Sequence, residues 1–293
     1  MIWDAEAYLA KAQNYFQRGA SRPSNEESLV WSVLGLEFLA RAALAKVSPV
    51  LNAAMEGPAI LDSLGFPDPQ GKRIQSVPMH TVLVRLPIVV ADFTPDRVKD
   101  FEYLLELRNA ELHTAAVRWD EPVSSWLPKL TRTIEPLARH LGTTVENLLG
   151  DELSEQGRQF VDSDDKKLLQ EVRTRINSAR DFWSRLTEEE KEARQPSVFA
   201  LGGWKQKCSA CDSAIIVDAT PVRSSRPYID DDGDTVSKVE YVITGASCNA
   251  CGLVLTSTGE VHAAGMPQTF DEIEVQELAP EQPDYVDYDY GND

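Results

Sequence analysis

Apolar residues recur at helical spacing through most of the first 195 positions. Between residues 1 and 20 they occur every three or four positions and Gly19 is a natural stop, so this stretch predicts a first helix. The stretch Asn25–Val47 is apolar around most of a helical circumference, which predicts a central helix. Ser24 and Glu27 have the spacing of a capping box at its start.

The segment 57–96 is rich in proline and glycine and has no clear period. Its apolar run, which starts at Val82 and continues past Pro87 to Val90, has the composition of a strand. Two nearby prolines favour short helices or an extended loop instead. Thr94-Pro95-Asp96 then combines a capping hydroxyl, a first-turn proline and an early acid, which predicts the start of a helix that runs through Leu112.

Two more helical regions are expected. The first covers about Pro122–His140, is kinked or split by its internal prolines and is closed by Gly142. Residues 137–150 are similar to the last two helices of a phage-repressor helix-turn-helix domain, but the upstream pair is missing, so we do not expect DNA binding through them. Residues 151–195 are charged, of mixed sign, and carry an apolar stripe, which predicts one or two helices that bridge domains or pack on the first domain.

The C-terminal third has a different pattern. Ala214–Val217 and Val239–Ile243 have strand composition, and Asp232-Gly233 marks a tight hairpin. Thr258-Gly259 is interpreted as a second turn, which would place His262 in a returning strand. From Asp271 onward the chain is acidic, without Lys or Arg, and too poor in apolar residues to fold alone.

These patterns predict an α+β multidomain protein. We expect a helical domain over residues 1–150, a charged helical connector over 151–200 and a small antiparallel β domain over 201–266. An acidic, disordered tail over 267–293 would complete the chain.

Charge is distributed unevenly. The net charge is −18, and residues 205–293 hold 5 Lys/Arg against 17 Asp/Glu, which accounts for −12 of it. Affinity for nucleic acid comes from neutralising phosphates, so any RNA site must be a local basic pocket in the N-terminal part. No apolar run is expected to span a membrane, and the acidic start does not resemble a signal peptide, so we expect a cytoplasmic protein without a membrane contact.

All four cysteines fall in the β region, as Cys208-x2-Cys211 and Cys248-x2-Cys251. Two such pairs can supply four thiolates to one tetrahedral metal ion. Two disulfides are the alternative, but they are unusual without a secretion signal, and a redox Cys-x-x-Cys motif usually occurs singly. The pattern resembles a zinc ribbon with a structural Zn²⁺, because no histidine or acid completes an open catalytic position.

The second chemical motif is Arg108-Asn109-x-x-x-His113 on the helix that begins near Pro95. Asn109 and His113 lie four apart on one helical face, and Arg108 lies partly round the helix. A guanidinium that binds phosphate and an imidazole that moves a proton are two groups needed to cleave RNA without a metal. The structural alternative is a surface ion pair between Arg108 and Glu111. Upstream, Glu37 and Arg41 are interpreted as an intrahelical ion pair, with Glu37 facing a site as the second interpretation.

With this helical context, residues 1–150 resemble the HEPN family of small α-helical domains. Arg108, Asn109 and His113 match that family's Arg-x4-6-His motif, including the polar residue after the arginine. The resemblance implies a metal-independent endoribonuclease of a toxin–antitoxin, phage-defence or CRISPR system, which acts as a homodimer with a composite site. It also implies that His113 is the general acid or base, that Arg108 binds the scissile phosphate, and that Asn109 orients the imidazole or holds a phosphate oxygen.

Two functions are therefore predicted. The first is an RNA endonuclease, in which the zinc ribbon recognises the substrate or a partner. The alternative is a non-catalytic HEPN-like dimerisation module whose ribbon binds protein or nucleic acid. The acidic, tyrosine-rich tail is interpreted as a solubilising segment, with mimicry of nucleic acid in a basic cleft as the sharper hypothesis.

Overall fold

The computed structural model describes residues 3–21, 25–67, 75–115, 121–194 and 204–275. The predicted cap at Ser24, the stop at Gln195-Pro196 and the end of the acidic tail from residue 276 lie outside these described residues.

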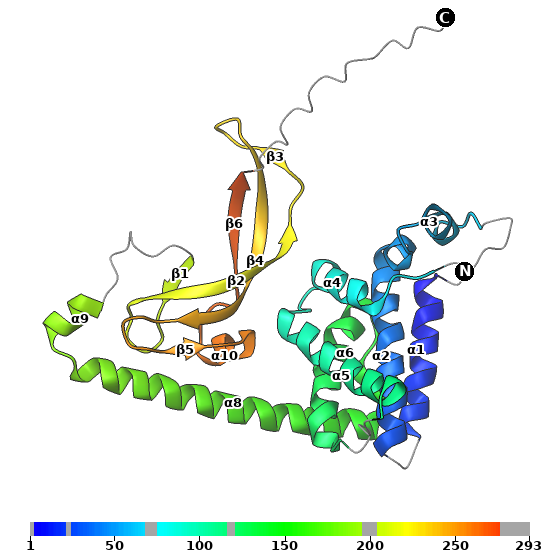
Figure 1. Cartoon of the computed structure of the whole chain (residues 1–293), viewed down its shortest axis with the longest axis horizontal. Helices are drawn as coiled ribbons and strands as arrows, with labels where there is room; N and C mark the ends of the chain where they lie inside the picture. The colour runs from blue at the N-terminus through cyan, green and yellow to red at the C-terminus, as the bar shows by residue number, and fades with distance from the viewer. Residues whose placement is uncertain (1–2, 22–24, 68–74, 116–120, 195–203, 276–293) are drawn as a thin grey trace, which may run out of the picture.

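The N-terminal part is a helical bundle (Figure 1). Its elements are α1 (Ala5–Ala20), α2 (Asn25–Val47), the short 3-10 helix η1 (Pro49–Asn52), α3 (Gly57–Ser63), α4 (Met79–Val89), α5 (Pro95–His113), α6 (Val123–Leu141) and α7 (Val145–Leu149). The prediction for α2 is confirmed at both ends, and the described residues of segment 57–96 include two short helices, α3 and α4, one of the two structures expected there. Helix α6 continues through both of its prolines as one element and ends at Gly142, whose φ of 77° is left-handed.

Helix α2 is central to the bundle, because it packs on α1, α4, α5 and α6. Large side chains from the surrounding helices fill the core against it, including Phe16, Phe101 and Trp126 with less than 2% exposure. Contrary to the sequence prediction, α2 is long and apolar enough to cross a membrane. In the structure 61% of that apolar window is buried inside the protein, as expected of a bundle's core helix.

A single long helix joins the bundle to the C-terminal part. Helix α8 (Asp151–Arg185) has 35 residues, which corresponds to about 52 Å, and α9 (Glu188–Arg194) comes after it. The first half of α8 packs on α6 and α7. The second half contributes Val172, Ile176 and Ala179 to the core of the β domain. Both predicted roles are confirmed, because α8 packs on the helical bundle and also bridges to the β domain, whose core it joins.

Gly157 allows the close contact between α8 and α6. A β-carbon at this position would collide with the Thr131 hydroxyl oxygen. We expect Gly157→Ala to lower the free energy of unfolding by about 1–3 kcal/mol, although alanine is the better helix former by about 1 kcal/mol. Thermal melts would measure this loss, and adding Thr131→Ala should recover most of it. Gly57→Ala is the control, because nothing lies within 4 Å of its β-carbon position. A Gly157→Ala protein that melts higher than wild type would contradict the packing argument.

The C-terminal part is a six-stranded antiparallel sheet with one helix (Figure 1). Its elements are β1 (Trp204–Lys207), β2 (Ala214–Ser224), β3 (Tyr228–Ile229), β4 (Thr235–Ser247), β5 (Val254–Leu255), α10 (Thr258–Ala263) and β6 (Thr269–Val275). Strand β4 is the longest and pairs with β2, β3, β5 and β6. The hairpin predicted at Asp232-Gly233 is confirmed, since Gly233 has a φ of 90° between the paired strands β3 and β4.

Two sequence predictions in this region are wrong. His262 lies in helix α10, not in a returning strand, because the Ser257 hydroxyl accepts a hydrogen bond from the Glu260 amide and caps a helix there. The sequence predicts a disordered tail from residue 267, but Thr269–Val275 form β6, which pairs along β4 from Val236 to Val242. Backbone pairing with β4 orders this acidic segment, which does not have to fold alone.

Polar contacts tie the β domain to the helices. The Gly259 amide at the start of α10 donates to the Asp96 carboxylate of α5 over 3.1 Å. From α8, Arg175 forms two hydrogen bonds to the Glu260 carboxylate and one to the Val254 carbonyl. The β domain is therefore held against both α5 and α8.

Candidate functional site

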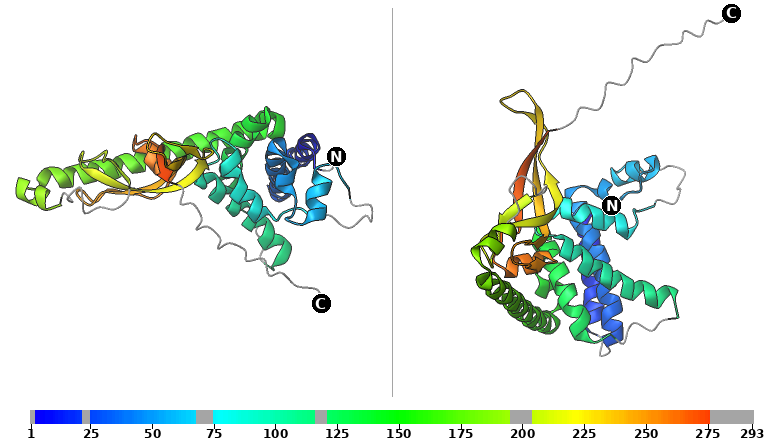
Figure 2. Two further views of the ribbon diagram at one scale, coloured as in Figure 1. Left: turned by 90° about the horizontal axis from the view of Figure 1, so that it is seen from above. Right: turned by 60° about the vertical axis from the view of Figure 1, so that its left-hand side comes forward.

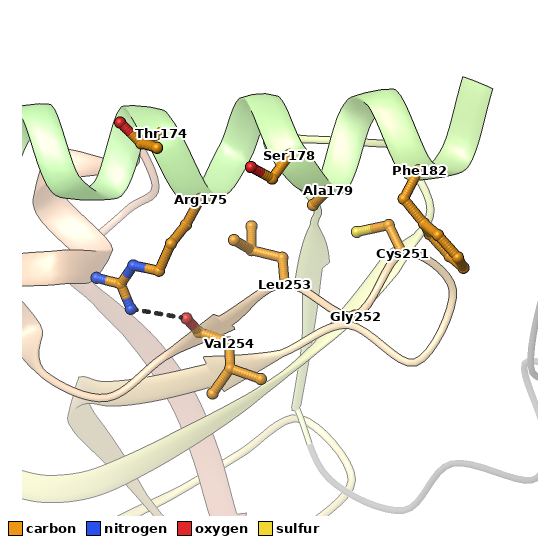
Figure 3. Close-up of a pocket in the computed structure, with 9 residues that line it drawn as sticks. All are labelled: Thr174, Arg175, Ser178, Ala179, Phe182, Cys251, Gly252, Leu253 and Val254. Atoms are coloured by element: carbon orange, nitrogen blue, oxygen red, sulfur yellow. Dashed lines mark hydrogen bonds between the residues drawn. The ribbon is translucent and has the colours of Figure 1, made fainter. Parts of the chain in front are cut away.

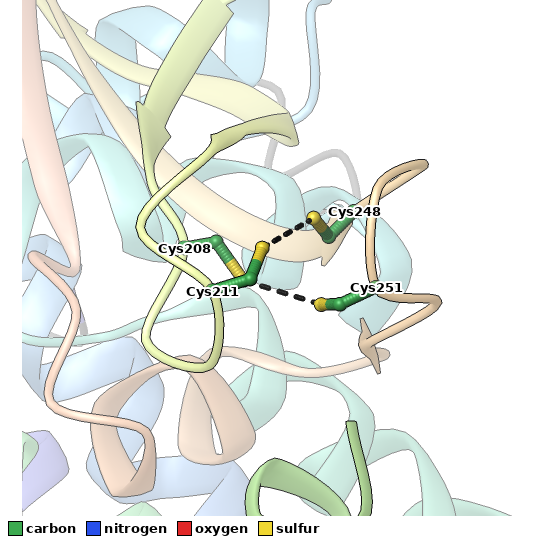
Figure 4. Close-up of side chains that lie close together, drawn as sticks. All are labelled: Cys208, Cys211, Cys248 and Cys251. Carbon is green, nitrogen blue, oxygen red and sulfur yellow. Dashed lines mark hydrogen bonds between the residues drawn. The ribbon is translucent and has the colours of Figure 1, made fainter. Parts of the chain in front are cut away.

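The four cysteines converge from two loops of the β domain (Figure 4). Their Sγ atoms all lie within 4.8 Å of one another, and all four cysteines are free of disulfides. Cys208 and Cys211 come from the turn between β1 and β2, and Cys248 and Cys251 from the turn between β4 and β5. Four sulfur atoms in this arrangement can hold a metal ion, as the spacing predicted.

Each pair lies on a tight backbone turn of the same form. The Cys208 amide donates to the Ser213 carbonyl, and the Cys248 amide donates to the Leu253 carbonyl. The residue after each second cysteine has a left-handed backbone, with φ of 61° at Asp212 and 78° at Gly252. This conformation explains the glycine after Cys251, while aspartate is one of the few other residues that adopt it.

The distances between the sulfur atoms fit one tetrahedral ion. The Cys208 and Cys251 sulfurs lie 3.7 Å apart, and the Cys211 and Cys248 sulfurs 3.6 Å apart. A tetrahedron with metal–sulfur bonds of about 2.3 Å has edges of about 3.8 Å. A hydrogen bond from Cys248 lowers the pKa of Cys208 to about 5, while burial raises the pKa of Cys251. Thiolates this close together repel one another, so a divalent cation among them would stabilise their charged form.

A groove runs beside the second cysteine turn, between it and α8 (Figure 3). Its volume is about 450 Å³. Thr174, Arg175, Ser178, Ala179 and Phe182 line it from α8, and residues 251–254 line the opposite side. No sequence pattern indicates this groove, because its two sides are about 70 residues apart in the chain. The turn that carries Cys251 and helix α8 therefore form the two walls of one groove.

The predicted RNA-cleaving residues lie on the last two turns of α5, and Arg108 is the anchored one. Its guanidinium forms a salt bridge with Glu37 of α2, and the two side chains are only 18% and 15% exposed. Burial raises the pKa of Glu37, and Arg108 and then Arg41 oppose that rise. The predicted intrahelical pair of Glu37 with Arg41 is therefore wrong, because Glu37 bonds Arg108 and Arg41 donates to the Val77 carbonyl over 2.9 Å.

Asn109 and His113 are exposed at the end of the same helix. The C-terminal end of α5 projects from the bundle in both views of Figure 2, and Leu112 beside the histidine is 57% exposed. Within the described part of the chain, no hydrogen bond joins Asn109 to His113. The structure thus places the three motif residues on one helix end, with the arginine turned into the bundle and the histidine toward solvent.

Sequence reasoning missed Glu37 as the partner of Arg108. The two residues are 71 positions apart, so no local spacing connects them. The available signal was a carboxylate in the middle of an otherwise apolar helix, because a buried charge requires a partner of opposite sign. Arg41 lies near the same carboxylate, and two buried guanidinium nitrogens, Arg41 Nη1 and Arg108 Nε, have no hydrogen-bond partner among the described residues.

The comparisons with known proteins leave the family open: no protein-family model, no curated protein and no solved structure matches this chain.

Proposed function

We propose that this protein is a metal-independent RNA endonuclease of the HEPN type, a defence or toxin effector that acts as a homodimer. His113 serves as the general acid or base in attack of a ribose 2′-hydroxyl on the adjacent phosphorus. The 2′-hydroxyl gives up its proton as the new 2′-oxygen–phosphorus bond forms. The bond to the 5′-oxygen breaks and that oxygen takes up a proton, so one proton is lost and one is gained; His113 carries out one of these two transfers and water the other. The products are a 2′,3′-cyclic phosphate end and a 5′-hydroxyl end.

The observation that carries this proposal is the arrangement of the motif at the projecting end of α5. A general acid or base must be reachable by the substrate, and His113 is exposed. A phosphate-binding arginine must be held in place, and Glu37 fixes Arg108 through one terminal nitrogen. Since the salt bridge occupies Nη2 and Nε is buried, the other terminal nitrogen, Nη1, binds the phosphate in the transition state.

A dimer is expected from the directions of these side chains. Arg108 and His113 are five residues apart, which places them about 140° apart around one helix. One copy therefore cannot bring both to one phosphate from the same face. Two copies that meet through the projecting ends of α5 bring the arginine of each beside the histidine of the other.

For the metal centre we propose zinc in a structural role. Zn²⁺ favours four thiolates in a tetrahedron, and the sulfur spacing agrees with that geometry. The ribbon around it is better suited to a protein partner than to RNA. Residues 205–275 carry 5 Lys/Arg against 11 Asp/Glu, and at least three of the five cations are paired with neighbouring acids.

The second candidate function is the non-catalytic dimerisation module, and one observation favours it. The Arg108–Glu37 salt bridge is half-buried and joins α5 to α2, so it can serve the fold alone. In that case neither Arg108 nor His113 would touch RNA.

The experiment that separates the two is an RNA cleavage assay in EDTA with total RNA and with tRNA. We expect the purified wild-type chain to cut both without added metal and to leave cyclic phosphate ends, which end-group analysis detects. Zinc content is measured in the same samples, because EDTA can also remove the ribbon's metal. Intact RNA after incubation with a zinc-loaded, dimeric protein would favour the dimerisation module.

A further inference from the structure

Four aromatic side chains of α1 and α2 form a continuous stack where these two helices pack together. Tyr8 stacks on Phe38 at 6.3 Å between ring centroids, Phe38 on Tyr15 at 5.4 Å, and Tyr15 on Trp31 at 5.5 Å. The ring planes lie within 24° of parallel. All four rings are partly exposed. We call these four residues the aromatic ladder.

Two exposed cations lie over the ladder. The Lys11 ammonium is 4.0 Å from the centroid of Phe38, and the Arg18 guanidinium is 5.1 Å from that of Trp31 and 5.8 Å from that of Tyr15. Both cations extend from α1 on flexible side chains that are free to turn outward to a phosphate. A flat base can then take the place of the cation on the ring face, since bases and cations both stack on aromatic rings.

The ladder continues into the arginines around Glu37. Arg41 of α2 lies close enough to both Tyr8 and Glu37 to interact with them electrostatically. Arg41 and Arg108 both flank the Glu37 carboxylate, so these three groups carry one net positive charge. From Trp31 to Glu37 the helix rises about 9 Å, which matches two to three stacked bases at about 3.4 Å each.

We propose that the aromatic ladder is a stacking platform for the unpaired bases of single-stranded RNA, and that it guides the strand toward Arg108. This inference rests on the proposed ribonuclease function and assigns it a substrate class. Bases take the places of Arg18 over Trp31 and of Lys11 over Phe38, and these two cations turn outward to contact the phosphates. Duplex RNA does not fit this platform, because its bases are already stacked and paired.

Charge favours RNA over a second copy of this chain as the occupant. Two copies that met through the ladder would bring Lys11 and Arg18 of each into one contact, where burying unpaired cations is costly. Phosphates neutralise the same cations. This face is also on the part of the chain with the more balanced charge, since residues 1–150 hold 15 Lys/Arg against 18 Asp/Glu.

The test measures binding of a labelled unstructured RNA of about ten nucleotides to full-length protein made cleavage-inactive by His113→Ala. We expect Trp31→Ala to weaken binding by about tenfold to a hundredfold, the range for loss of one stacked base. Trp31→Phe should restore most of the affinity. Phe182→Ala is the matched control, because this exposed ring also carries a cation, Arg194 at 5.0 Å, but lies on α8.

A second measurement does not depend on how the variants fold. RNA that contains 5-iodouridine is photo-cross-linked to the protein with Trp31 intact, and the modified peptides are identified by mass spectrometry. We expect adducts on residues of the ladder, and competition by single-stranded but not by duplex RNA.

Three results would overturn the platform. The first is cross-linking only outside α1 and α2, and the second is equal RNA affinity of the Trp31→Ala and Phe182→Ala proteins. The third is loss of the dimer in Trp31→Ala with unchanged RNA affinity per subunit, which would make this face a contact between copies. Each is compatible with RNA cleavage by the wild-type protein, so the ladder can fail while the proposed ribonuclease function stands. Absence of both cleavage and binding would remove the function itself.

Discussion

Cys208→Ser is expected to abolish stable metal binding and to unfold the β domain. A structural Zn²⁺ contributes apparent free energies of about 10–16 kcal/mol in small zinc domains, which is as large as the total stability of a typical domain, about 5–15 kcal/mol. The sulfurs are also part of the packing, because Cys208, Cys248 and Cys251 lie in the buried cluster of the β domain. Metal content by mass spectrometry and a thermal melt would show the loss.

In the Cys208→Ser protein the loss of structure should be limited to the β domain and the part of α8 that packs on it. Because Val172, Ile176 and Ala179 share a core with the cysteines, hydrogen exchange is expected to accelerate in the second half of α8 as well as in residues 204–275. The α2 amides should stay protected, because their core is separate. Ser209→Ala in the same turn is the control and should cost only about 1 kcal/mol, for one hydrogen bond to Ala264. A metal-free variant with an unchanged melt would mean that the site is not structural.

His113→Ala is expected to lower RNA cleavage by about 10²–10⁴-fold while the dimer stays folded. The side chain is exposed at the end of α5, so its removal leaves no cavity. The control is His80→Ala, which removes another exposed histidine from the bundle. Equal cleavage by the wild-type and His113→Ala proteins would exclude this imidazole from the mechanism.

Mixing two inactive proteins tests whether the site is shared. If Arg108 of one copy works with His113 of the other, mixed dimers of Arg108→Ala and His113→Ala contain one intact site and should recover part of the activity. Arg108→Ala also leaves Glu37 half-buried without its partner, so a lower melting temperature is expected for that variant alone. No recovery from mixed dimers that are shown to form would place both groups in one subunit.

The parts of this fold that could be predicted from sequence are those with local causes. The bounds of α2 are explained by its apolar circumference and the cysteine cluster by its spacing. Helix α10 also had a local signal, since Ser257 and Glu260 have the spacing of a capping box. Gly259 favours a turn at the same place. In the folded chain the helix cap formed by Ser257 and Glu260 prevails, and a helix forms instead of a turn.

The misassigned contacts are distant in sequence. Side chains of β6 alternate between exposed and partly buried positions along β4. This alternation is difficult to recognise in the sequence, because the segment is acidic and acidic residues are uncommon in strands. The aromatic ladder likewise combines two helices, and its residues appear in each helix only as ordinary members of an apolar stripe. The salt bridge between Glu37 and Arg108 likewise joins two helices that are distant in the sequence.

Helix α8 also restricts how the length of this chain can change. Each residue inserted in a helix turns the segment beyond it by about 100° and moves that segment by about 1.5 Å. One extra residue between Phe160 and Leu168 would swing the β domain away from α5 and separate Gly259 from Asp96. An insertion close to whole turns, such as about seven or eleven residues, would keep the orientation and change the reach. The number of residues in α8 therefore fixes how the β domain is rotated relative to the helical bundle.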